Sequence, residues 1–256
     1  MWELYDELIA GIPENIVVEN FNVGCNWSMV KAGGNVGIAL TVKGRSRNNI
    51  YRGNIRGDAL KDLASCVKSW NFIEASLGMA AINCFYNSPE KIRSLEGFHK
   101  RACAERGGDA EVKEDAFLVS SEEAAGKKVA VIGHFPNIES QLEPVCELSI
   151  LERNTQPGDY PDSACEYILG EQDFVFITGM TFTNKTLPRL LELVRPGARV
   201  IMVGPSVPIA PTLFGHGITD LDGFCVTDPE KIDRLIRLGI KKDIFDGGKM
   251  VSIKKF

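Results

Sequence analysis

The segment 127–154 constrains the fold more than any other part of this chain, because it has the pattern of a strand, a helix and a second strand. An apolar run at 129–132 ends at Gly133, and a second apolar run ends at Glu152. Glu152 follows Gly133 by 19 residues, close to the spacing of about 20 at which nucleotide-binding α/β domains place an acidic residue against a ribose. The segment therefore predicts the opening of such a domain.

The loop after the first of these strands departs from the glycine-rich dinucleotide fingerprint. Residues 133–137 read GHFPN, with a single glycine where the fingerprint has three. We therefore predict a ligand other than a standard dinucleotide. His134, one of three histidines in the chain, is a candidate general base or ligand. An ordinary turn residue is the alternative, and it is the interpretation that we favour for a single histidine beside a phenylalanine.

Strands and helices alternate through the remainder of the second half. Apolar strands separated by helices predict a parallel sheet that is covered on both faces. Ligands bind such sheets beyond the carboxyl ends of the strands. The predicted strands are 146–152, 173–179, 198–206, 222–228 and 247–256, and the predicted helices are 137–144, 183–197 and 229–238.

The carboxyl ends of the predicted strands are rich in glycine, proline and small polar residues, which suits a ligand cleft and also plain turns. Glu152 is expected to hold a ribose diol or an amine, with a solvent-exposed strand-end acid as the alternative. Asn184 lies where a helix N-terminus would offer backbone N–H groups to an anion, with simple capping as the alternative. The candidates on this side are Gly133, His134, Glu152, Thr178, Asn184, Gly204, Pro205 and Ser206.

The first half has the pattern of a small α+β unit. Residues 19–30 and 36–43 each alternate between apolar and polar side chains, which predicts two half-buried strands. The glycine pair at 33–34 suits a hairpin turn between them. Helices are predicted at 57–70 and 71–87, and the second is apolar nearly all round and is therefore expected to be buried.

The charged and aperiodic segment 96–115 separates the two halves, and its Gly-Gly-Asp sequence predicts a break. We place a domain boundary near 105–115. The predicted units are 1–108 and 109–256.

Composition limits the classes of partner. The net charge of −5 argues against nucleic acid, because phosphate binding requires a basic face. No apolar run approaches the roughly 20 residues of a membrane helix, so no membrane partner is predicted. The acidic, amphipathic N-terminus does not have the pattern of a secretory signal. A cytoplasmic location is the expectation.

Seven cysteines are dispersed along the chain without a C-x-x-C pair. This pattern is typical of reduced core thiols, and it is unlike a disulfide framework or a zinc site. The sequence also has no G-x-S-x-G, P-loop or H-E-x-x-H motif. A hydrolase nucleophile, a P-loop phosphate site and a histidine metal site are therefore not predicted.

Several segments together resemble a prokaryotic family described as "putative heavy-metal chelation". They are GHFPNIE at 133–139, LERN at 151–154, PGDYPDSACEYIL at 157–169, TGMTFTNKT at 178–186 and GPSVPIAPTLFGHG at 204–217, with NVGCNWSMVKAGGNVGIAL and LGMAAINC in the first half. The resemblance covers essentially the whole chain. It implies an α/β fold class, with an enolase-N-terminal-like α+β domain of a β-hairpin plus helices, followed by a Rossmann-like parallel-sheet domain.

The same resemblance implies a ligand site at the junction of the two domains. The motif match assigns Glu152, Thr178, Asn184 and 204–206 to its C-terminal side. For Asn83, a hydrogen-bonded core asparagine is the alternative that we favour, because a buried amide must be hydrogen-bonded. The candidates from the N-terminal side are Asn26, Trp27, Gly33, Gly34 and Asn83.

Three functions stay open at this point. An enzyme that makes or modifies a small metal-chelating metabolite is ranked first, because two domains over a polar cleft can close around a substrate. A nucleoside-like cofactor such as S-adenosylmethionine would then lie near Glu152. The second is a non-catalytic binding protein for a metal chelate or a nucleoside-like metabolite. The third is direct binding of a heavy metal by Glu, Asp and Cys side chains, which a thiol-rich cluster would support. The expected partner is a small molecule or metal chelate, and a homodimer is the commonest assembly.

Overall fold

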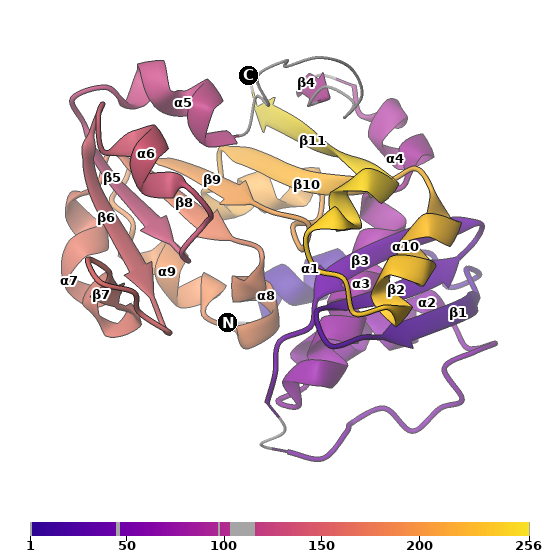
Figure 1. The fold of residues 1–256 in the computed structure, drawn as a ribbon. Coiled ribbons are helices and arrows are strands. Elements are labelled where there is room, and N and C mark those ends of the chain that lie inside the picture. Colours follow the sequence, from indigo (N-terminus) through magenta and orange to yellow (C-terminus); the bar gives the residue numbers. More distant parts are fainter. Residues whose placement is uncertain (1, 45–46, 97, 103–115, 256) are drawn as a thin grey trace.

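The computed structural model describes residues 2–44, 47–96, 98–102 and 116–255 (Figure 1). Within these residues the chain forms a three-stranded sheet of order β1-β2-β3 and an eight-stranded sheet of order β4-β11-β10-β9-β8-β5-β6-β7. The predicted fold class is confirmed, because a small α+β unit precedes an α/β unit whose sheet is mostly parallel.

The small sheet is an antiparallel meander of β1 (Val18–Val23), β2 (Trp27–Ala32) and β3 (Asn35–Leu40). The predicted hairpin between β2 and β3 is confirmed, with φ of +55° and +75° at its two glycines. The prediction of one strand over 19–30 is wrong. The chain reverses at 24–26, where the Gly24 N–H donates to the Trp27 carbonyl at 2.9 Å.

Helix α3 (Phe72–Tyr86) packs against the small sheet and is buried nearly all round, as its sequence predicts. The helix predicted over 57–70 is shorter, with α2 (Leu60–Ala64) followed by the 3-10 turn η1 (Ser65–Lys68). Among the described residues, no helix is long and apolar enough to cross a membrane. The other helices of this half are α1 (Glu3–Ala10) and α4 (Pro89–Ser94).

The large sheet reverses its strand order next to its first strand. From β5 the chain moves outward to β6 and β7, and then returns to the other side of β5 to form β8, β9 and β10, all parallel. The switch point therefore lies between β5 and β8. The strands are β5 (Lys128–Ile132), β6 (Glu147–Glu152), β7 (Tyr160–Pro161), β8 (Phe174–Thr178), β9 (Arg199–Val203) and β10 (Asp220–Val226).

The far edge of this sheet is antiparallel, although the sequence predicts its last strand as part of a parallel sheet. β11 (Gly248–Lys255) runs against β10, and β4 (Phe98–Ala102) runs against β11. The reason lies in α10 (Pro229–Arg237), which packs on β1 and β2 of the small sheet, so the chain returns without a parallel crossover. Residue 108, the predicted domain boundary, lies outside the described residues, and β4, from the predicted first unit, joins the large sheet.

Helices cover both faces of the large sheet. Those on one face belong to a cluster that includes Phe117 and Ile138, and those on the other face belong to a cluster that includes Phe182 and Leu187. The helices are α5 (Ala116–Ala124) and α6 (Ile138–Leu142) on the first face, and α7 (Cys165–Ile168), α8 (Met180–Asn184) and α9 (Leu187–Leu193) on the second. Besides η1, the described residues contain the short 3-10 segments η2 (Asp162–Ala164), η3 (Leu169–Glu171), η4 (Pro211–His216) and η5 (Asp243–Gly247).

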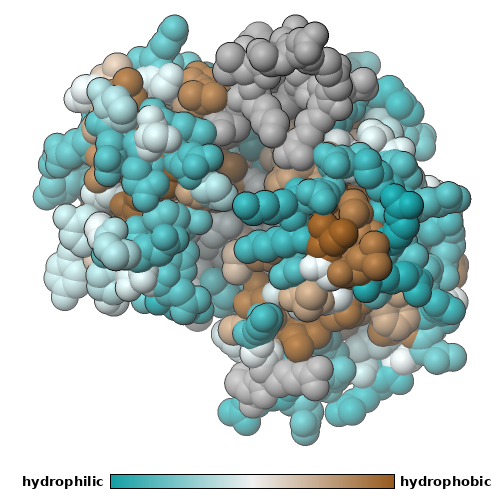
Figure 2. Space-filling model, viewed as in Figure 1, coloured by the Kyte–Doolittle hydropathy of each residue, from teal (hydrophilic) through white to brown (hydrophobic). Residues whose placement is uncertain are grey.

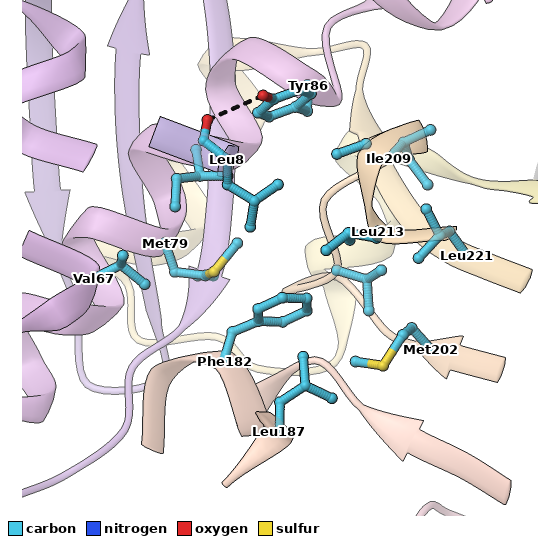
Figure 3. Close-up of a cluster of buried hydrophobic side chains, with 14 of the residues drawn as sticks. Leu8, Val67, Met79, Tyr86, Phe182, Leu187, Met202, Ile209, Leu213 and Leu221 are labelled. Atoms are coloured by element: carbon cyan, nitrogen blue, oxygen red, sulfur yellow. Dashed lines mark hydrogen bonds between the residues drawn. The ribbon is translucent and has the colours of Figure 1, made fainter. Parts of the chain in front are cut away.

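One buried cluster joins the two units (Figure 3). Leu8 and Met79 from the first half meet Phe182, Met202 and others from the second half. A polar contact also crosses this junction, because the Tyr5 hydroxyl donates to the Phe182 carbonyl at 3.0 Å. Within the first unit, the Tyr86 hydroxyl donates to the Leu8 carbonyl at 3.0 Å (Figure 3). The two units therefore share one core.

Asn87, directly after α3, holds the loop that follows β9. Its side-chain nitrogen donates to the carbonyls of Val207 at 2.9 Å and Phe224 at 3.2 Å, and its oxygen accepts from the Ile209 N–H at 2.8 Å. The side chain is buried, so these bonds replace water for groups that would otherwise be unsatisfied.

The close approach of α3 to β3 requires glycine at position 37. A Cβ at Gly37 would lie 2.0 Å from the Cys84 backbone nitrogen. We expect Gly37→Ala to lower the free energy of unfolding by about 2–3 kcal/mol or more, because α3 must shift off the sheet. Urea unfolding followed by circular dichroism measures this. Gly215→Ala is the matched control, since a Cβ there meets nothing within 4 Å, and equal midpoints for the two variants would contradict the packing.

Candidate functional site

A cleft of about 510 Å³ lies where the carboxyl ends of β5, β6 and β8 meet the N-terminal unit. Its volume falls within the range of small-molecule sites, about 300–1,000 Å³. The molecule is visibly hollowed between its two lobes (Figure 2). The cleft occupies the switch point of the large sheet, the place where open α/β sheets bind ligands.

Gly133 forms part of the cleft lining directly after β5. Its φ is +103°, a conformation that glycine adopts without strain, and its N–H donates to the Leu151 carbonyl at 2.9 Å. A Cβ at this position would approach the Thr178 methyl group to 3.2 Å. Glycine therefore lets the chain turn here while the ends of β5 and β8 stay close.

Glu152 lines the cleft at the end of β6 and links two loops. One carboxylate oxygen accepts from the His134 N–H at 3.1 Å, and the other accepts from the Asn154 N–H at 2.9 Å. Each carboxylate oxygen can accept more than one hydrogen bond. Glu152 can therefore hold the loops and still accept from a hydroxyl or amine in the cleft.

His134 is engaged by carboxylates and is not part of the cleft lining. Its Nδ1 lies 3.0 and 3.1 Å from the two carboxylate oxygens of Asp159, and its Nε2 lies 3.2 Å from Glu139. The side chain of Asp159 is almost fully buried. His134 therefore links the loop after β5 to the segment around Asp159, as the alternative interpretation of a turn residue expects.

Thr178 and Asn184 both line the cleft from β8 and α8. The helix start predicted near residues 183–184 is wrong, because Asn184 ends α8 and Lys185 follows with φ of +67°. The Asn184 side-chain oxygen accepts from the Thr186 N–H at 3.0 Å and from its hydroxyl at 2.7 Å. The next helix, α9, begins later than predicted, at Leu187 after Thr186. The Asn184 amide nitrogen has no hydrogen-bond partner among the described residues, so it can donate to a ligand.

Gly204, Pro205 and Ser206 lie at the contact between the two units and not in the cleft lining. The Ser206 hydroxyl accepts from the Leu40 N–H at 2.9 Å. The buried Asn83 donates to the carbonyls of Ile38 at 2.8 Å and Pro205 at 3.3 Å. Both contacts hold the end of the small sheet against the loop after β9.

Of the N-terminal candidates, Asn26 lines the cleft. Trp27 is buried beside it, and its indole N–H donates to the Lys241 carbonyl at 3.1 Å. Gly33 and Gly34 form the hairpin turn, and Gly33 lines a separate cavity of about 410 Å³. The structure therefore brings together Gly133, Glu152, Thr178, Asn184 and Asn26, and it places the other candidates outside the lining.

Several lining residues were missed by the sequence reasoning, and they include Cys25, Thr41, Lys43 and Lys241. Cys25 could have been found, because it shares a turn with Asn26. Lys241 gives no such signal, since it follows α10 and reaches the cleft only through tertiary packing.

The cysteines mostly behave as predicted. Four of the six described cysteines are buried, and burial raises the pKa of Cys165, which lines the cleft, to about 11. Cys25 is exposed. Within the described part of the chain, no three His, Cys, Asp or Glu side chains gather as a metal-binding group. The residues of the cleft therefore do not fit a direct heavy-metal centre.

Lys185 connects the α8–α9 turn to the start of α3 beside the cleft. Its ammonium donates to the carbonyls of Ser69 and Thr183, and it lies 5.2 Å from the ring centre of Phe72. Burial lowers the pKa of Lys185 to about 8, although the nearby Glu74 opposes this shift.

The lowered pKa of Lys185 predicts a pH dependence of stability. The unfolded chain holds this proton up to the ordinary lysine pKa of about 10.4, whereas the folded protein releases it near 8. Between these values the unfolded state binds more protons, so this contribution to stability rises with pH. We expect the free energy of unfolding of the wild type, minus that of Lys185→Met, to increase between pH 8 and pH 10 in urea titrations. If this difference in unfolding free energy did not change between pH 8 and pH 10, the lowered pKa of Lys185 would be contradicted.

The two backbone contacts of Glu152 predict a structural effect that is separate from ligand binding. Glu152→Ala leaves the N–H groups of His134 and Asn154 without their acceptor, so we expect a loss of about 1–3 kcal/mol in the free energy of unfolding. Chemical unfolding measures it. Glu147→Ala, at the opposite and exposed end of β6, is the control and should change stability by less than about 0.5 kcal/mol. Equal effects of the two substitutions would contradict the linking role.

Two family models match the chain, and both are described as "Putative heavy-metal chelation". DUF4213 matches residues 5–86, and DUF364 matches residues 115–255. The family resemblance drawn from the sequence motifs is confirmed.

Relatives of known sequence or structure are similar to nearly the whole chain. An uncharacterized protein of Methanocaldococcus jannaschii is 27% identical over 251 residues, which cover 94% of this chain and 90% of that protein. A crystal structure of a DUF364-family protein of unknown function from Desulfitobacterium hafniense DCB-2 is 44% identical, with a TM-score of 0.88 over 100% of this chain and 99% of that one. A second such structure, from Pyrococcus horikoshii, is 22% identical with a TM-score of 0.80 over 98% of each chain, and it shows the fold alone.

Proposed function

Because this chain belongs to the DUF364 family described as "Putative heavy-metal chelation", we propose that it binds a small, polar, metal-chelating metabolite in the cleft between its two units. A heavy metal would then reach the protein already held by the organic chelator. The observation that carries this proposal is a ligand-sized cleft at the switch point of the sheet, lined by polar side chains from both units.

The polar groups of the cleft support a ligand that both donates and accepts hydrogen bonds. Glu152 can accept from a hydroxyl or an amine, and the free amide nitrogen of Asn184 can donate to an oxygen. Hydroxyl, amine and carboxylate groups are also those with which organic chelators hold metals. The cleft thus suits the outer surface of a chelator, although its own residues do not form a metal-binding group.

A second function is favoured by the position of Glu152. It ends the second strand of the sheet, 19 residues after Gly133, where related folds bind a ribose. An enzyme that makes or modifies the chelator with a nucleoside-like cofactor would use this acid to hold the ribose diol. A cytoplasmic location and a homodimeric assembly stay predictions.

Thermal shift and native mass spectrometry test the binding proposal with a panel of compounds. The panel contains transition metals alone, the same metals complexed by aminocarboxylates, the free chelators, nucleosides, S-adenosyl compounds and pterins. Saturation at 100 times the dissociation constant adds about 2.7 kcal/mol, or roughly 5–10 °C for a chain of this size. We expect the metal complexes to stabilise the protein more than either component alone.

Matched variants keep this test specific to the cleft. Asn184→Ala should reduce the shift, whereas Glu147→Ala, outside the cleft lining, should preserve it. Stabilisation by an adenosyl compound that Asn184→Ala or Glu152→Ala abolishes would support the enzyme in place of the binding protein. If the metals alone stabilised the protein as much as the metal complexes do, both the chelate-binding protein and the enzyme would be overturned in favour of direct metal binding.

A further inference from the structure

The charged residues of the cleft are unevenly arranged. Its lining contains Lys43, Lys241 and Arg153 as cations, and Glu152 and Asp162 as acids. Arg153 is paired with Asp162 at 2.9 Å. Neither lysine ammonium has a carboxylate within ion-pair distance in the described part of the chain. Although the whole chain carries a net charge of −5, two cations of its cleft lining are uncompensated.

Lys43 extends from a backbone that is fixed on both sides. The N–H of Val42 donates to the Ser76 hydroxyl at 2.9 Å, and the carbonyl of Gly44 accepts from the Phe72 N–H at 3.0 Å. Both partners belong to the buried helix α3. The position of Lys43 at the cleft is therefore set by the core.

Lys241 is held in the same way from the other end of the chain. Its carbonyl accepts from the buried Trp27 indole at 3.1 Å, and the Gly239 carbonyl accepts from the Asn26 side chain at 2.8 Å. Asn26 also accepts the Thr41 N–H on its own carbonyl at 2.9 Å. One residue, Asn26, thus fixes both segments that carry the two lysines.

The segments that carry Lys43 and Lys241 are held against the small sheet. Glu152 ends β6 and Asn184 ends α8, so the cleft has two cations beside the small sheet and acceptor and amide groups beside the large sheet. We infer that Lys43 and Lys241 form an anion subsite, and that the ligand carries a carboxylate or phosphate at one end and a hydroxyl or amine at the other. Two charge-assisted contacts favour this charge pattern, because both ammonium groups attract an anionic end of the ligand and gain much less from a neutral one. This inference rests on the ligand cleft of the proposed function and names the chemistry of its ligand.

Isothermal titration of citrate and of inorganic phosphate tests the subsite directly. The full chain is compared with Lys43→Ala, Lys241→Ala and the control Lys242→Ala, whose exposed lysine is adjacent in sequence but does not line the cleft. We expect citrate or phosphate to bind the wild type, with affinity about tenfold lower in each cleft variant and unchanged in Lys242→Ala. Added sodium chloride should weaken the binding. The anion that binds more tightly identifies the acidic group as carboxylate or phosphate.

The inference is overturned if neither anion binds, if the cleft variants bind like the wild type, or if Lys242→Ala weakens binding equally. Both lysines are exposed, so the melting temperature of each unliganded variant should match that of the wild type and show that the variant is folded. Metal chelates that still stabilise both lysine variants would leave the proposed function standing without the anion subsite. Lysine-dependent citrate binding without any response to chelates would support the anion subsite and overturn the proposed binding of a metal chelate.

Discussion

The nearly complete burial of helix α3 is the constraint on which the rest of the structure depends. A helix that is apolar nearly all round must be covered on most sides, and here the small sheet, α2, η1 and α8 supply that cover. Polar residues near its C-terminal end, Asn83 and Asn87, then bind the loop after β9 and fix the two units against each other. The same helix anchors the segment around Lys43. The shape of the cleft is thus a consequence of how α3 is buried.

Most of the fold could be predicted from periodicity, and the failures have identifiable causes. The alternation of apolar and polar residues continues through 24–26, so it does not reveal the turn that separates β1 from β2. The antiparallel direction of β11 could not be predicted, because it depends on the packing of α10 against the small sheet. That packing is a tertiary contact which the local sequence does not indicate. The helix predicted from residue 183 is interrupted at Lys185, where φ is positive without a glycine to mark it.

The candidate site was predictable on one side and much less so on the other. Gly133, Glu152 and Thr178 follow strand ends, and parallel strands bring their ends to one edge of the sheet. Gly33 and Gly34 precede β3, whereas the cleft residues 40–43 lie at its far end, about 20 Å away for six extended residues. The segment 239–241 meets Asn26 and Trp27 only through contacts between distant parts of the chain, which no local pattern encodes.

The contact of α1 with η4 and Phe182 has a consequence for synthesis on the ribosome. Tyr5 donates to the Phe182 carbonyl at 3.0 Å, and α1 packs against residues 211–216. Helix α1 is therefore synthesised well before Phe182 and η4, its partners. Contacts between residues so far apart in the sequence form slowly. Until then the surface of α1 that packs on η4, and the part of α3 that packs on α8, lack their cover. Exposed apolar surfaces of this kind are prone to aggregate. The nascent chain should depend on chaperones for longer than its modest length would suggest.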